Sequence, residues 1–417
     1  MGKSVGAVKA GDVAKAARKI KTPFYFYDAA AIRSRYIALR GVLSERWRVY
    51  YAAKANPNVE ILKIYRGLGA SAECSSAGEM LAALKAGFSE ADIALSGPLK
   101  GAQELKLLKT KSPAVIHAET EAELGALNKL GGKRAVALRL NVSLGSDGGK
   151  EGRIMSGGMD KFGFSPEEAT KILLRREEYE NLAFVGFHFY IGTQVLSTKT
   201  WINGARTYAR CVGEICKKTG LAPKYLNFGG GLGIPYREND EEFDLGEFKT
   251  GIARLEKTIL GFKALRKARL FMEPGRYLVG PAGVYVMKVA ALKKIRGMDF
   301  AITDGGIHHA LFPFRVSREF PAFLANRRGK GTRRYVLGGP LCTTLDQSDL
   351  PLNLPELREG DLIAVGNSGA YGYGSGMHFF LSHPLPAEVL KDGGKFFIVR
   401  KGSESAHIFR LQTRRPL

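Results

Sequence analysis

The stretch that decides the fold is Arg48-Val49-Tyr50-Tyr51-Ala52-Ala53-Lys54-Ala55-Asn56-Pro57. Its β-branched, aromatic and small residues predict a buried strand that stops at Asn-Pro. A lysine at the end of such a strand must be neutralised, paired or hydrogen-bonded, because an unpaired buried charge is costly. Burial favours the neutral amine, which is the form that condenses with a carbonyl group. The plainer interpretation is that the Lys54 ammonium group snorkels out to solvent.

Short apolar runs of this kind recur along the chain and alternate with helix-like segments. The runs fall at residues 49–55, 70–74, 93–96, 114–118, 135–142, 184–191, 225–228 and 270–272. Helical patterns occur at 29–47, 77–86, 102–109, 121–129, 166–175 and 200–218. Eight strands alternating with helices over about 240 residues predict a (β/α)8 barrel. A doubly wound open sheet is the competing architecture.

The pattern of predicted secondary structure changes after residue 280. Short β-like runs at 284–289, 300–302, 335–337, 362–365, 396–399 and 407–411 alternate with turn residues, and helical patterns are scarce. We therefore expect an α/β barrel over residues 29–280 and an all-β sandwich or small barrel over 281–417. An arm and strand at 1–28 are expected to join the β domain. The glycine-rich stretch 144–163 is longer than an ordinary loop and has the character of a lid.

Composition indicates an ordinary globular protein, with 45% hydrophobic and 25% charged residues in 417. We expect no membrane association, because no apolar stretch approaches the length of a span. Residues 1–21 are basic and lack an apolar signal core. The four cysteines (Cys74, Cys211, Cys216 and Cys342) form no CxxC pair. Both features predict a cytoplasmic protein with reduced thiols.

The chain is strongly basic, with a formal net charge of +23 and basic clusters at 263–269 and 327–334. Such an excess attracts anionic substrates, acidic proteins or nucleic acid. The clusters are not interleaved with aromatic residues and no nucleic-acid motif is present, so we expect no nucleic-acid binding. A solvated basic surface is the simplest interpretation, and an acidic partner protein is the next.

Two motifs follow late strands of the predicted barrel. The first is Tyr225-Leu226-Asn227-Phe228-Gly229-Gly230-Gly231-Leu232-Gly233, and the second is Leu270-Phe271-Met272-Glu273-Pro274-Gly275-Arg276. Glycines let backbone N–H groups approach an anion, and barrels bind phosphate after late strands, although a plain tight turn is the simpler interpretation. Glu273 and Arg276 form either a local ion pair or separate contacts, the acid to a cofactor's ring nitrogen and the arginine to its phosphate.

Two further motifs place reactive side chains near turns. Gly186-Phe187-His188-Phe189-Tyr190-Ile191-Gly192-Thr193-Gln194 holds either a core histidine or a flat ring stacked on a planar cofactor. Cys342 and Tyr371 lie in turn-rich loops of the β domain, where one domain can contribute to another's site. The adjacent His308 and His309 cannot both face one metal from a strand, and no other ligand spacing is present, so we expect no metal.

Taken together, these motifs resemble those of the fold-type III pyridoxal-phosphate decarboxylases, the diaminopimelate and eukaryotic ornithine decarboxylase family. In order they are Tyr-Ala-Ala-Lys-Ala-Asn, His…Gly-Thr-Gln, Gly-Gly-Gly-Leu-Gly, Glu-Pro-Gly-Arg, Gly-Pro-Leu-Cys and Gly-Ala-Tyr. The resemblance covers residues 23–411. It implies an alanine racemase-like barrel with a C-terminal β domain, pyridoxal 5'-phosphate as cofactor, and an obligate homodimer with shared active sites.

The resemblance also implies roles for particular residues. Lys54 forms the internal aldimine, His188 stacks on the cofactor ring and Glu273 pairs with its nitrogen. Cys342 reaches across the dimer interface to protonate the product carbanion. The other residues implied to bind the cofactor, mainly at its phosphate, are Thr193, Gly229, Gly230, Gly231, Gly275, Arg276 and Tyr371. Glu73 and Glu79 match acids near Lys54; the candidate substrate contacts are Arg139, Thr343 and Asp346, and Lys161 matches another barrel position.

Two departures from the family pattern concern the substrate. The residue after the reactive cysteine is an acid in enzymes that act on diaminopimelate, lysine or ornithine, but it is Thr343 here. The His188 motif is also two residues longer than the usual His-Ile-Gly-Ser-Gln. Both argue against a substrate with a distal cationic amine. The Leu-Cys-Thr-Thr-Leu-Asp motif and the stretch 380–389 instead resemble a subgroup that decarboxylates glutamyl groups on acyl carrier proteins or citryl-amino acids.

We therefore expect decarboxylation of an L-α-amino acid or of an amino-acyl conjugate, either carrier-bound or citryl-linked. Acyl carrier proteins are acidic, which is compatible with the basic chain. Meso-diaminopimelate decarboxylase is the first alternative. An amino-acid racemase is the second, although related racemases place an arginine where Glu273 stands. The third is an inactive regulatory binding protein, against which the joint presence of Lys54, Cys342 and Tyr371 argues.

Overall fold

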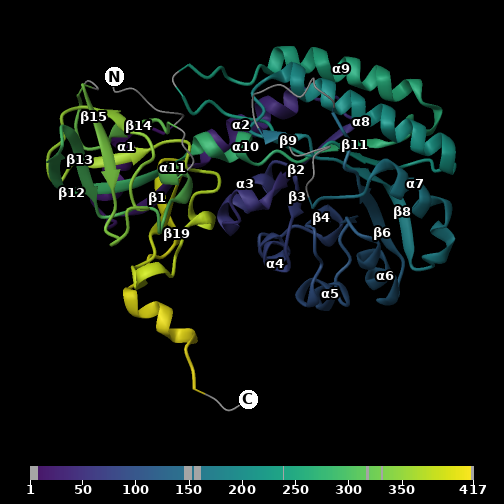
Figure 1. The fold of residues 1–417 in the computed structure, drawn as a ribbon, viewed down its shortest axis with the longest axis horizontal. Helices are drawn as coiled ribbons and strands as arrows, with labels where there is room; N and C mark the ends of the chain where they lie inside the picture. Colours follow the sequence, from purple (N-terminus) through teal and green to yellow (C-terminus); the bar gives the residue numbers. More distant parts are fainter. Residues whose placement is uncertain are drawn as a thin grey trace. The chain divides into compact units, whose positions relative to one another are not determined.

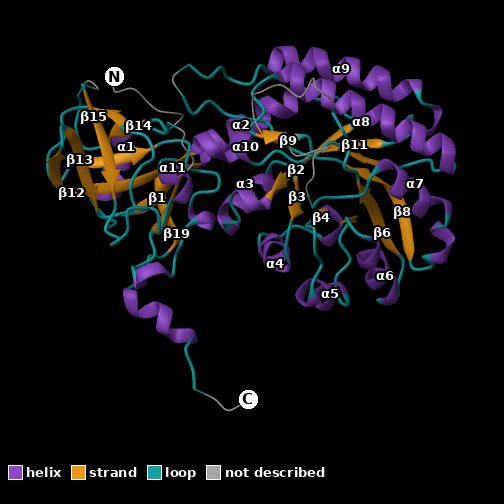
Figure 2. Cartoon of the chain, in the orientation of Figure 1, coloured by secondary structure: helices purple, strands orange, loops and turns teal. Residues whose placement is uncertain are grey.

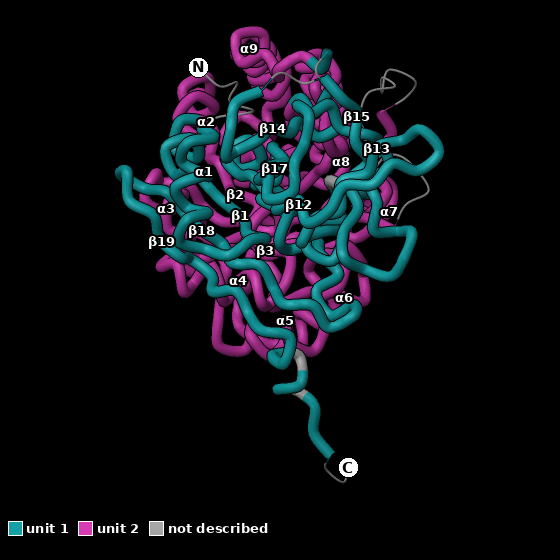
Figure 3. The backbone as a smooth tube through the Cα atoms, turned by 90° about the vertical axis from the view of Figure 1, so that its left-hand side faces the viewer, with its two compact units in different colours: residues 1–34, 235–240, 278–417 teal, residues 35–234, 241–277 magenta. Residues whose placement is uncertain are grey.

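The computed structural model describes residues 8–144, 153–154, 161–237, 239–315, 319–329 and 332–414. The chain divides into two compact units (Figure 3). Unit 1 comprises residues 1–34, 235–240 and 278–417, and unit 2 comprises residues 35–234 and 241–277. Most of the lid predicted at 144–163 lies outside the described residues.

Unit 2 contains a closed barrel of eight parallel strands in the order β10-β11-β2-β3-β4-β5-β6-β8 (Figure 1). They are β2 (Trp47–Ala52), β3 (Ser71–Cys74), β4 (Ile93–Leu95), β5 (Val115–Ala118), β6 (Arg134–Arg139), β8 (Leu182–His188), β10 (Tyr225–Asn227) and β11 (Arg269–Met272). Pairing of β11 with β2 closes the ring. The predicted (β/α)8 barrel is therefore confirmed, and each of the eight apolar runs overlaps one strand.

Helices alternate with these strands and surround the barrel (Figure 2). They are α2 (Ala29–Gly41), α3 (Val59–Gly67), α4 (Ala77–Lys85), α5 (Ala102–Leu108), α6 (Glu121–Lys129), α7 (Pro166–Leu174), α8 (Thr198–Thr219), α9 (Leu245–Gly261) and α10 (Arg276–Val279). Shorter elements are η1 (Ala53–Ala55), η2 (Glu90–Asp92), η4 (Arg176–Glu178), η5 (Lys263–Leu265) and the paired β7 (Arg153–Ile154) and β9 (Gly192–Thr193). Several helices begin where a short polar side chain accepts a hydrogen bond from a first-turn N–H, namely at Asn58, Ser76, Thr120, Ser165 and Asp244.

The interior of the barrel is filled in layers. One layer is a cluster of buried side chains made by Tyr50, Ala94, Val115, Ala137 and Tyr225. Side chains alternate across a strand, so the residue two positions further along points into the same interior, one layer nearer the carboxyl end. Four of the five residues in that next layer are polar, namely Ser96, His117, Arg139 and Asn227, and the fifth is Ala52. The alternation of side chains along each strand therefore places polar groups at the carboxyl end of the barrel.

Unit 1 is built on a nine-stranded sheet whose main path is β16-β15-β13-β12-β1-β18-β19. Its strands are β1 (Phe24–Asp28), β12 (Gly283–Ile295), β13 (Met298–Thr303), β14 (Ala322–Leu324), β15 (Arg333–Gly338), β16 (Leu352–Leu354), β17 (Leu362–Val365), β18 (Ala387–Asp392) and β19 (Lys395–Arg400). β1 lies between β12 and β18. Helix α1 (Ala10–Ala17) packs Val13 and Ala16 against Phe24 and Phe26 of β1. The other short helices are η6 (Gly280–Ala282), α11 (Leu311–Arg315), η7 (Tyr373–Ser375) and η8 (Phe380–Ser382).

The strand predicted at 407–411 is wrong, because these residues belong to the 3-10 helix η9 (Ser405–Leu411). The ring of His407 stacks on Phe379 beside η8, with ring centroids 6.4 Å apart. The ring contact with Phe379 therefore replaces the expected pairing to a sheet. The short strands β14 and β16 and the longer β18 were not among the predicted runs. No helix in the described part of the chain is long and apolar enough to cross a bilayer.

Gly186 provides a test of how closely β8 and β10 approach each other. A Cβ atom at this position would lie 1.8 Å from the Tyr225 carbonyl oxygen, so the two strands would have to separate. We expect Gly186→Ala to lower the free energy of unfolding by about 3 kcal/mol in urea denaturation. The matched control is Gly125→Ala in α6, where an added Cβ meets nothing within 4 Å. It should raise the free energy of unfolding by about 0.7 kcal/mol, and equal effects would contradict the close approach.

Candidate active site at the carboxyl ends of the barrel strands

The polar residues of the candidate site come from all eight strands of the barrel. Each lies at or just beyond the carboxyl end of its strand, where parallel strands of a barrel bring functional side chains together. In strand order the residues are Lys54 after β2, Glu73 in β3, Ser96 after β4, His117 in β5, Arg139 in β6, His188 in β8, Asn227 in β10 and Glu273 after β11.

Lys54 lies on η1 rather than in the strand, which ends at Ala52. Its side chain is 40% exposed, so of the two interpretations of the sequence the structure agrees with a lysine that reaches solvent and not with a buried one. The Nζ atom lies 3.0 Å from Oε2 of Glu73, whose side chain is fully buried. The hydroxyl of Ser75 donates to the other Glu73 oxygen at 2.9 Å. Pairing with a buried carboxylate, rather than burial itself, therefore stabilises the lysine at the barrel mouth.

Glu73 is accompanied by a second acid on the next helix. Glu79 accepts a hydrogen bond from the Ser75 amide at 2.7 Å, while the Ser76 hydroxyl caps α4 by accepting from the Glu79 amide. Burial raises the pKa of the Glu79 carboxyl, and the Ser75 amide and Lys54 oppose that rise. Both acids named from the sequence thus lie on the Lys54 side of the site.

Glu273 is a buried acid that follows β11, the strand paired with β2. Its residue is 5% exposed. One carboxylate oxygen accepts a hydrogen bond from the Asn227 amide at 2.6 Å, and the other lies 3.1 Å from Nε2 of His188. The Asn227 side-chain oxygen in turn accepts from the Gly229 amide at 2.8 Å. Three strand ends are therefore tied together by one carboxylate.

A second histidine, His117, lies beneath His188. The two rings stack with centroids 4.1 Å apart and an interplanar angle of 12°. His117 contacts the Ser96 hydroxyl through Nδ1 at 2.8 Å and the Tyr225 hydroxyl through Nε2 at 2.9 Å. Burial holds the pKa of both imidazoles well below the usual value of 6.5. Both rings are therefore neutral at physiological pH.

His117, His188 and Glu273 also present three possible metal ligand atoms within 4.8 Å of one another. The two imidazole planes are nearly parallel, however, so their in-plane lone pairs run side by side instead of converging on one point. Metal coordination requires ligand atoms that converge. The arrangement is better suited to a stack of flat rings.

The glycines after β10 bring several backbone segments together. Added Cβ atoms at Gly229, Gly230 and Gly231 would lie 2.3, 2.1 and 2.2 Å from the carbonyl oxygens of Phe189, Glu273 and Gly192. Only glycine allows this approach. Within the described part of the chain, the amides of Gly230 and Gly231 donate to no protein acceptor. Thr193 lies in β9, which adjoins this turn through Gly192.

The Glu-Pro-Gly-Arg motif packs closely against the segment that carries Lys54. A Cβ atom at Gly275 would lie 2.8 Å from the Ala55 Cβ, and the Ala52 amide donates to the Pro274 carbonyl at 3.3 Å. Arg276 begins α10 immediately afterwards. The motif therefore joins the last strand of the barrel to the first.

Of the candidate substrate contacts, only Arg139 lies in unit 2. Its guanidinium group pairs with the buried Glu119 at 2.9 Å and covers the Phe162 ring at 4.3 Å. Lys161 also approaches the Phe162 ring, at 5.5 Å, and is exposed. Arg139 is therefore charge-compensated at the edge of the site.

The remaining predicted residues lie in unit 1. Cys342 is exposed, and Tyr371 has a positive φ of 54°. The carboxylate of Asp346 accepts hydrogen bonds from the amides of Ile307 at 2.7 Å and Leu341 at 2.8 Å, so it fixes the loop that carries Cys342. The Thr343 hydroxyl accepts from the Leu345 amide at 3.2 Å.

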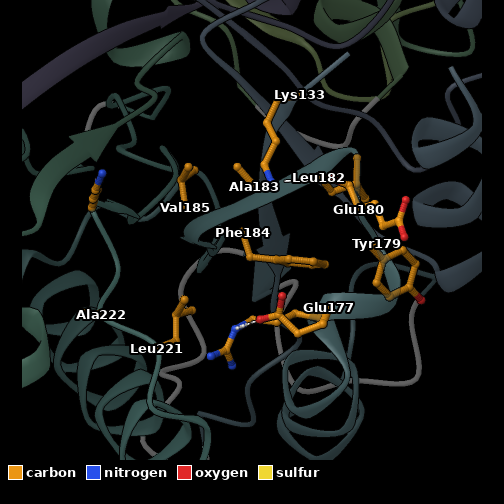
Figure 4. Close-up of a pocket in the computed structure, with 12 residues that line it drawn as sticks. Lys133, Glu177, Tyr179, Glu180, Leu182, Ala183, Phe184, Val185, Leu221 and Ala222 are labelled. Atoms are coloured by element: carbon orange, nitrogen blue, oxygen red, sulfur yellow. Dashed lines mark hydrogen bonds and ion pairs between the residues drawn. The ribbon is translucent and has the colours of Figure 1, made fainter. Parts of the chain in front are cut away.

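A separate hollow lies at the opposite, amino end of the barrel strands (Figure 4). It has a volume of about 320 Å³ and is lined by residues that include Lys133, Arg176, Glu177, Phe184 and Lys224. Arg176 and Glu177 pair with each other at 3.6 Å. The charges here do not converge on one point, in contrast to the network around Glu273.

The fold and site together combine an eight-stranded parallel barrel with a lysine amine, a buried acid and a glycine turn at the carboxyl ends of its strands. Residues 29–280 match the family model described as "Pyridoxal-dependent decarboxylase, pyridoxal binding domain". The chain belongs to this family of decarboxylases, and its cofactor is pyridoxal 5'-phosphate.

Individual relatives span nearly the whole chain. It is 32% identical to the L-glutamyl-[BtrI acyl-carrier protein] decarboxylase of Niallia circulans, over 95% of this chain and 94% of that protein. It is 28% identical to diaminopimelate decarboxylase from Helicobacter pylori complexed with L-lysine, with a TM-score of 0.84 over 96% and 98% of the two chains. It is 25% identical to SrLDC in complex with PLP and cadaverine, with a TM-score of 0.76 over 92% and 94%.

The residues present fit this cofactor. Lys54 offers an amine for the aldehyde, Glu273 offers a buried carboxylate for the ring nitrogen, and the Gly230 and Gly231 amides offer donors for the phosphate. His188 has a buried Nδ1 atom with no partner among the described residues. His117 and Asn227 were not among the predicted site residues, although both lie two positions beyond an inward-facing strand residue, a spacing that indicates them.

Asn227 tests whether Glu273 is held as a buried carboxylate. In Asn227→Asp two carboxyl groups would share a 2.6 Å contact, which raises the pKa of one of them. The loss in unfolding free energy is complete at pH values above that raised pKa and disappears below the pKa that the carboxyl has in the unfolded state. The variant should therefore be about 3 kcal/mol less stable than wild type at pH 8 and should recover as the pH falls towards 4.5. Urea midpoints measured against pH would show this.

Asn227→Ala is the matched control for this experiment. It removes the same amide without adding a charge, so its cost of about 2 kcal/mol should depend on pH much less than that of Asn227→Asp. If the two variants gave the same pH profile, Glu273 would not be held as the structure shows.

Proposed function

We propose that this chain removes the α-carboxylate of an L-amino acid carried as an amino-acyl conjugate, such as a glutamyl group on an acyl carrier protein. The observation that carries the decarboxylase chemistry is the placement of a lysine amine and a buried carboxylate at the carboxyl ends of two neighbouring strands, β2 and β11, at one barrel mouth. The conjugate is supported by the Niallia circulans relative, whose name specifies such a substrate. It is also supported by Thr343, which replaces an acid of the diaminopimelate-type pattern.

The proposed roles follow the positions of the residues. Lys54 would hold the cofactor at its aldehyde carbon, and the Glu73 carboxylate would balance the positive charge of the lysine. The His188 ring lies flat against the cofactor ring. The phosphate is proposed to be bound by Thr193, Gly229, Gly230, Gly231, Gly275, Arg276 and Tyr371. Cys342 is proposed to protonate the product carbon from the partner subunit of a homodimer.

The cofactor, when bound, supplies an electron sink for the pair released by Cα–COO⁻ cleavage. Glu273 keeps a proton on the ring nitrogen, which strengthens that sink. Asn227 and its contact to the Gly229 amide hold Glu273 in place. Arg139, paired with Glu119, keeps a positive charge near the site without leaving it uncompensated.

The proposed partner and location follow from charge and cysteines. An acidic carrier protein complements a chain with a net charge of +23. We propose a cytoplasmic homodimer that does not bind nucleic acid. All four cysteines are free, as reducing conditions require.

The substrate assignment is tested by CO₂ release from the cofactor-loaded protein. We expect kcat/KM for an L-glutamyl thioester of an acyl carrier protein to exceed that for free meso-diaminopimelate by about a hundredfold, because Thr343 stands where the diaminopimelate-type pattern has an acid for a distal amine. Robust turnover of diaminopimelate would instead identify the lysine-pathway enzyme.

A variant and two further measurements separate the remaining alternatives. Thr343→Glu restores the acid and should lower the ratio of kcat/KM for the carrier-bound substrate to that for diaminopimelate by about tenfold. Thr343→Ser should leave this ratio unchanged. Exchange of solvent deuterium at Cα with loss of stereochemistry and no CO₂ would identify a racemase. A purified protein that binds no cofactor would be a regulatory binding protein.

A further inference from the structure

The stacked histidines join parts of the barrel that are not neighbours. His117 lies on β5 and His188 on β8, with β6 between them in the barrel. Their rings nonetheless stack at 4.1 Å across the interior. His117 is fully buried and His188 is 3% exposed, so the contact is shielded from solvent. One face of His188 is therefore covered by a residue that has no role in the proposed chemistry.

The two rings differ in how they are held. His117 is anchored through both nitrogens, by the Ser96 hydroxyl at 2.8 Å and the Tyr225 hydroxyl at 2.9 Å. The Tyr225 hydroxyl is itself fixed by the Asn227 amide at 2.6 Å. Any rotation of the His117 ring would break one or both contacts. His188 contacts Glu273 through Nε2, and its Nδ1 has no partner among the described residues.

The contact between His188 and Glu273 competes with the proposed role of Glu273. If His188 carried a proton, it would form a buried ion pair with the carboxylate at 3.1 Å. A carboxylate held in that way would be less available to the cofactor's ring nitrogen. The charged groups that act on His188 are the cations of Lys54, Lys100 and Arg139, which disfavour its protonation, and the carboxylates of Glu73 and Glu273, which favour it. Water reaching the ring would also favour protonation.

We propose that His117 is a positioning residue that fixes the ring plane of His188 and keeps water from it, so that Glu273 stays free for the cofactor. The His117 ring, anchored at both ends, is the surface on which His188 lies. The opposite face of His188 is then presented to the cofactor in one orientation. This inference rests on the proposed function of Glu273 and His188.

Two substitutions at His117 separate the flat ring from its hydrogen bonds. His117→Asn keeps a polar group but removes the ring and admits water beside His188. His117→Phe keeps a flat ring and loses both anchoring contacts. In the cofactor-free protein, nitrogen NMR of the imidazoles should show His188 neutral at pH 6 in wild type and His117→Phe, and largely protonated in His117→Asn.

The cofactor affinity should follow the same order. We expect the dissociation constant of pyridoxal phosphate, measured by fluorescence titration, to rise about tenfold in His117→Asn at pH 6 and less than about threefold at pH 8. His117→Phe should stay within about threefold of wild type at both pH values. A role in folding alone would lower stability without making the affinity depend on pH.

The controls remove single hydroxyl groups. Tyr225→Phe and Ser96→Ala each delete one hydrogen bond to His117. Both should raise the dissociation constant of pyridoxal phosphate at pH 6, but by less than His117→Asn does. These variants keep the test available if His117→Asn does not fold. Tyr65→Phe deletes a buried hydroxyl that has no partner among the described residues and should leave affinity unchanged. Wild-type behaviour of His117→Asn, or of both anchor variants, would overturn the inference. If wild type binds no pyridoxal phosphate, the proposed function fails, whereas the His188 titration still tests His117.

Discussion

The arrangement of the site depends on one buried carboxylate. Glu273 lies where β8, β10 and β11 end, and each neighbouring strand end supplies a group to it or beside it. Leaving a buried carboxylate without partners would be costly, so the ends of these strands have to stay together. The amide of Asn227 meets that requirement while also holding the Gly229 turn. The acid that the proposed chemistry needs is thus also a structural junction of the barrel.

Much of the fold could be predicted because the barrel repeats a simple pattern. Eight apolar runs gave eight strands, and the strand period placed polar residues in one layer at the carboxyl end. Ala137 and Arg139 illustrate this, because residues two apart on a strand share a face. Glu273, Lys54 and the glycine turn could be recognised because each follows a predicted strand. Each also lies close to a proline, which restricts the backbone, or to glycines, which give it more freedom.

The rest could not be predicted because it depends on contacts between distant segments. No spacing in the sequence relates His117 to His188, which stack across the barrel. The family resemblance placed Glu73 near Lys54, but no local pattern in the sequence indicates that the two form an ion pair at 3.0 Å. The local sequence of the helix at Ser405–Leu411 has the pattern of a strand. The contact between its His407 ring and Phe379 is visible only in three dimensions.

The central claim is that the amine of Lys54 carries the cofactor at the barrel mouth that also holds Glu273. Its most direct test is borohydride reduction of the protein loaded with pyridoxal phosphate, followed by peptide mapping. The account predicts a single pyridoxyl label on the peptide that contains Lys54, and no label after Lys54→Ala. A label on Lys100 or Lys161 with Lys54 unmodified, or no label at all, would contradict it.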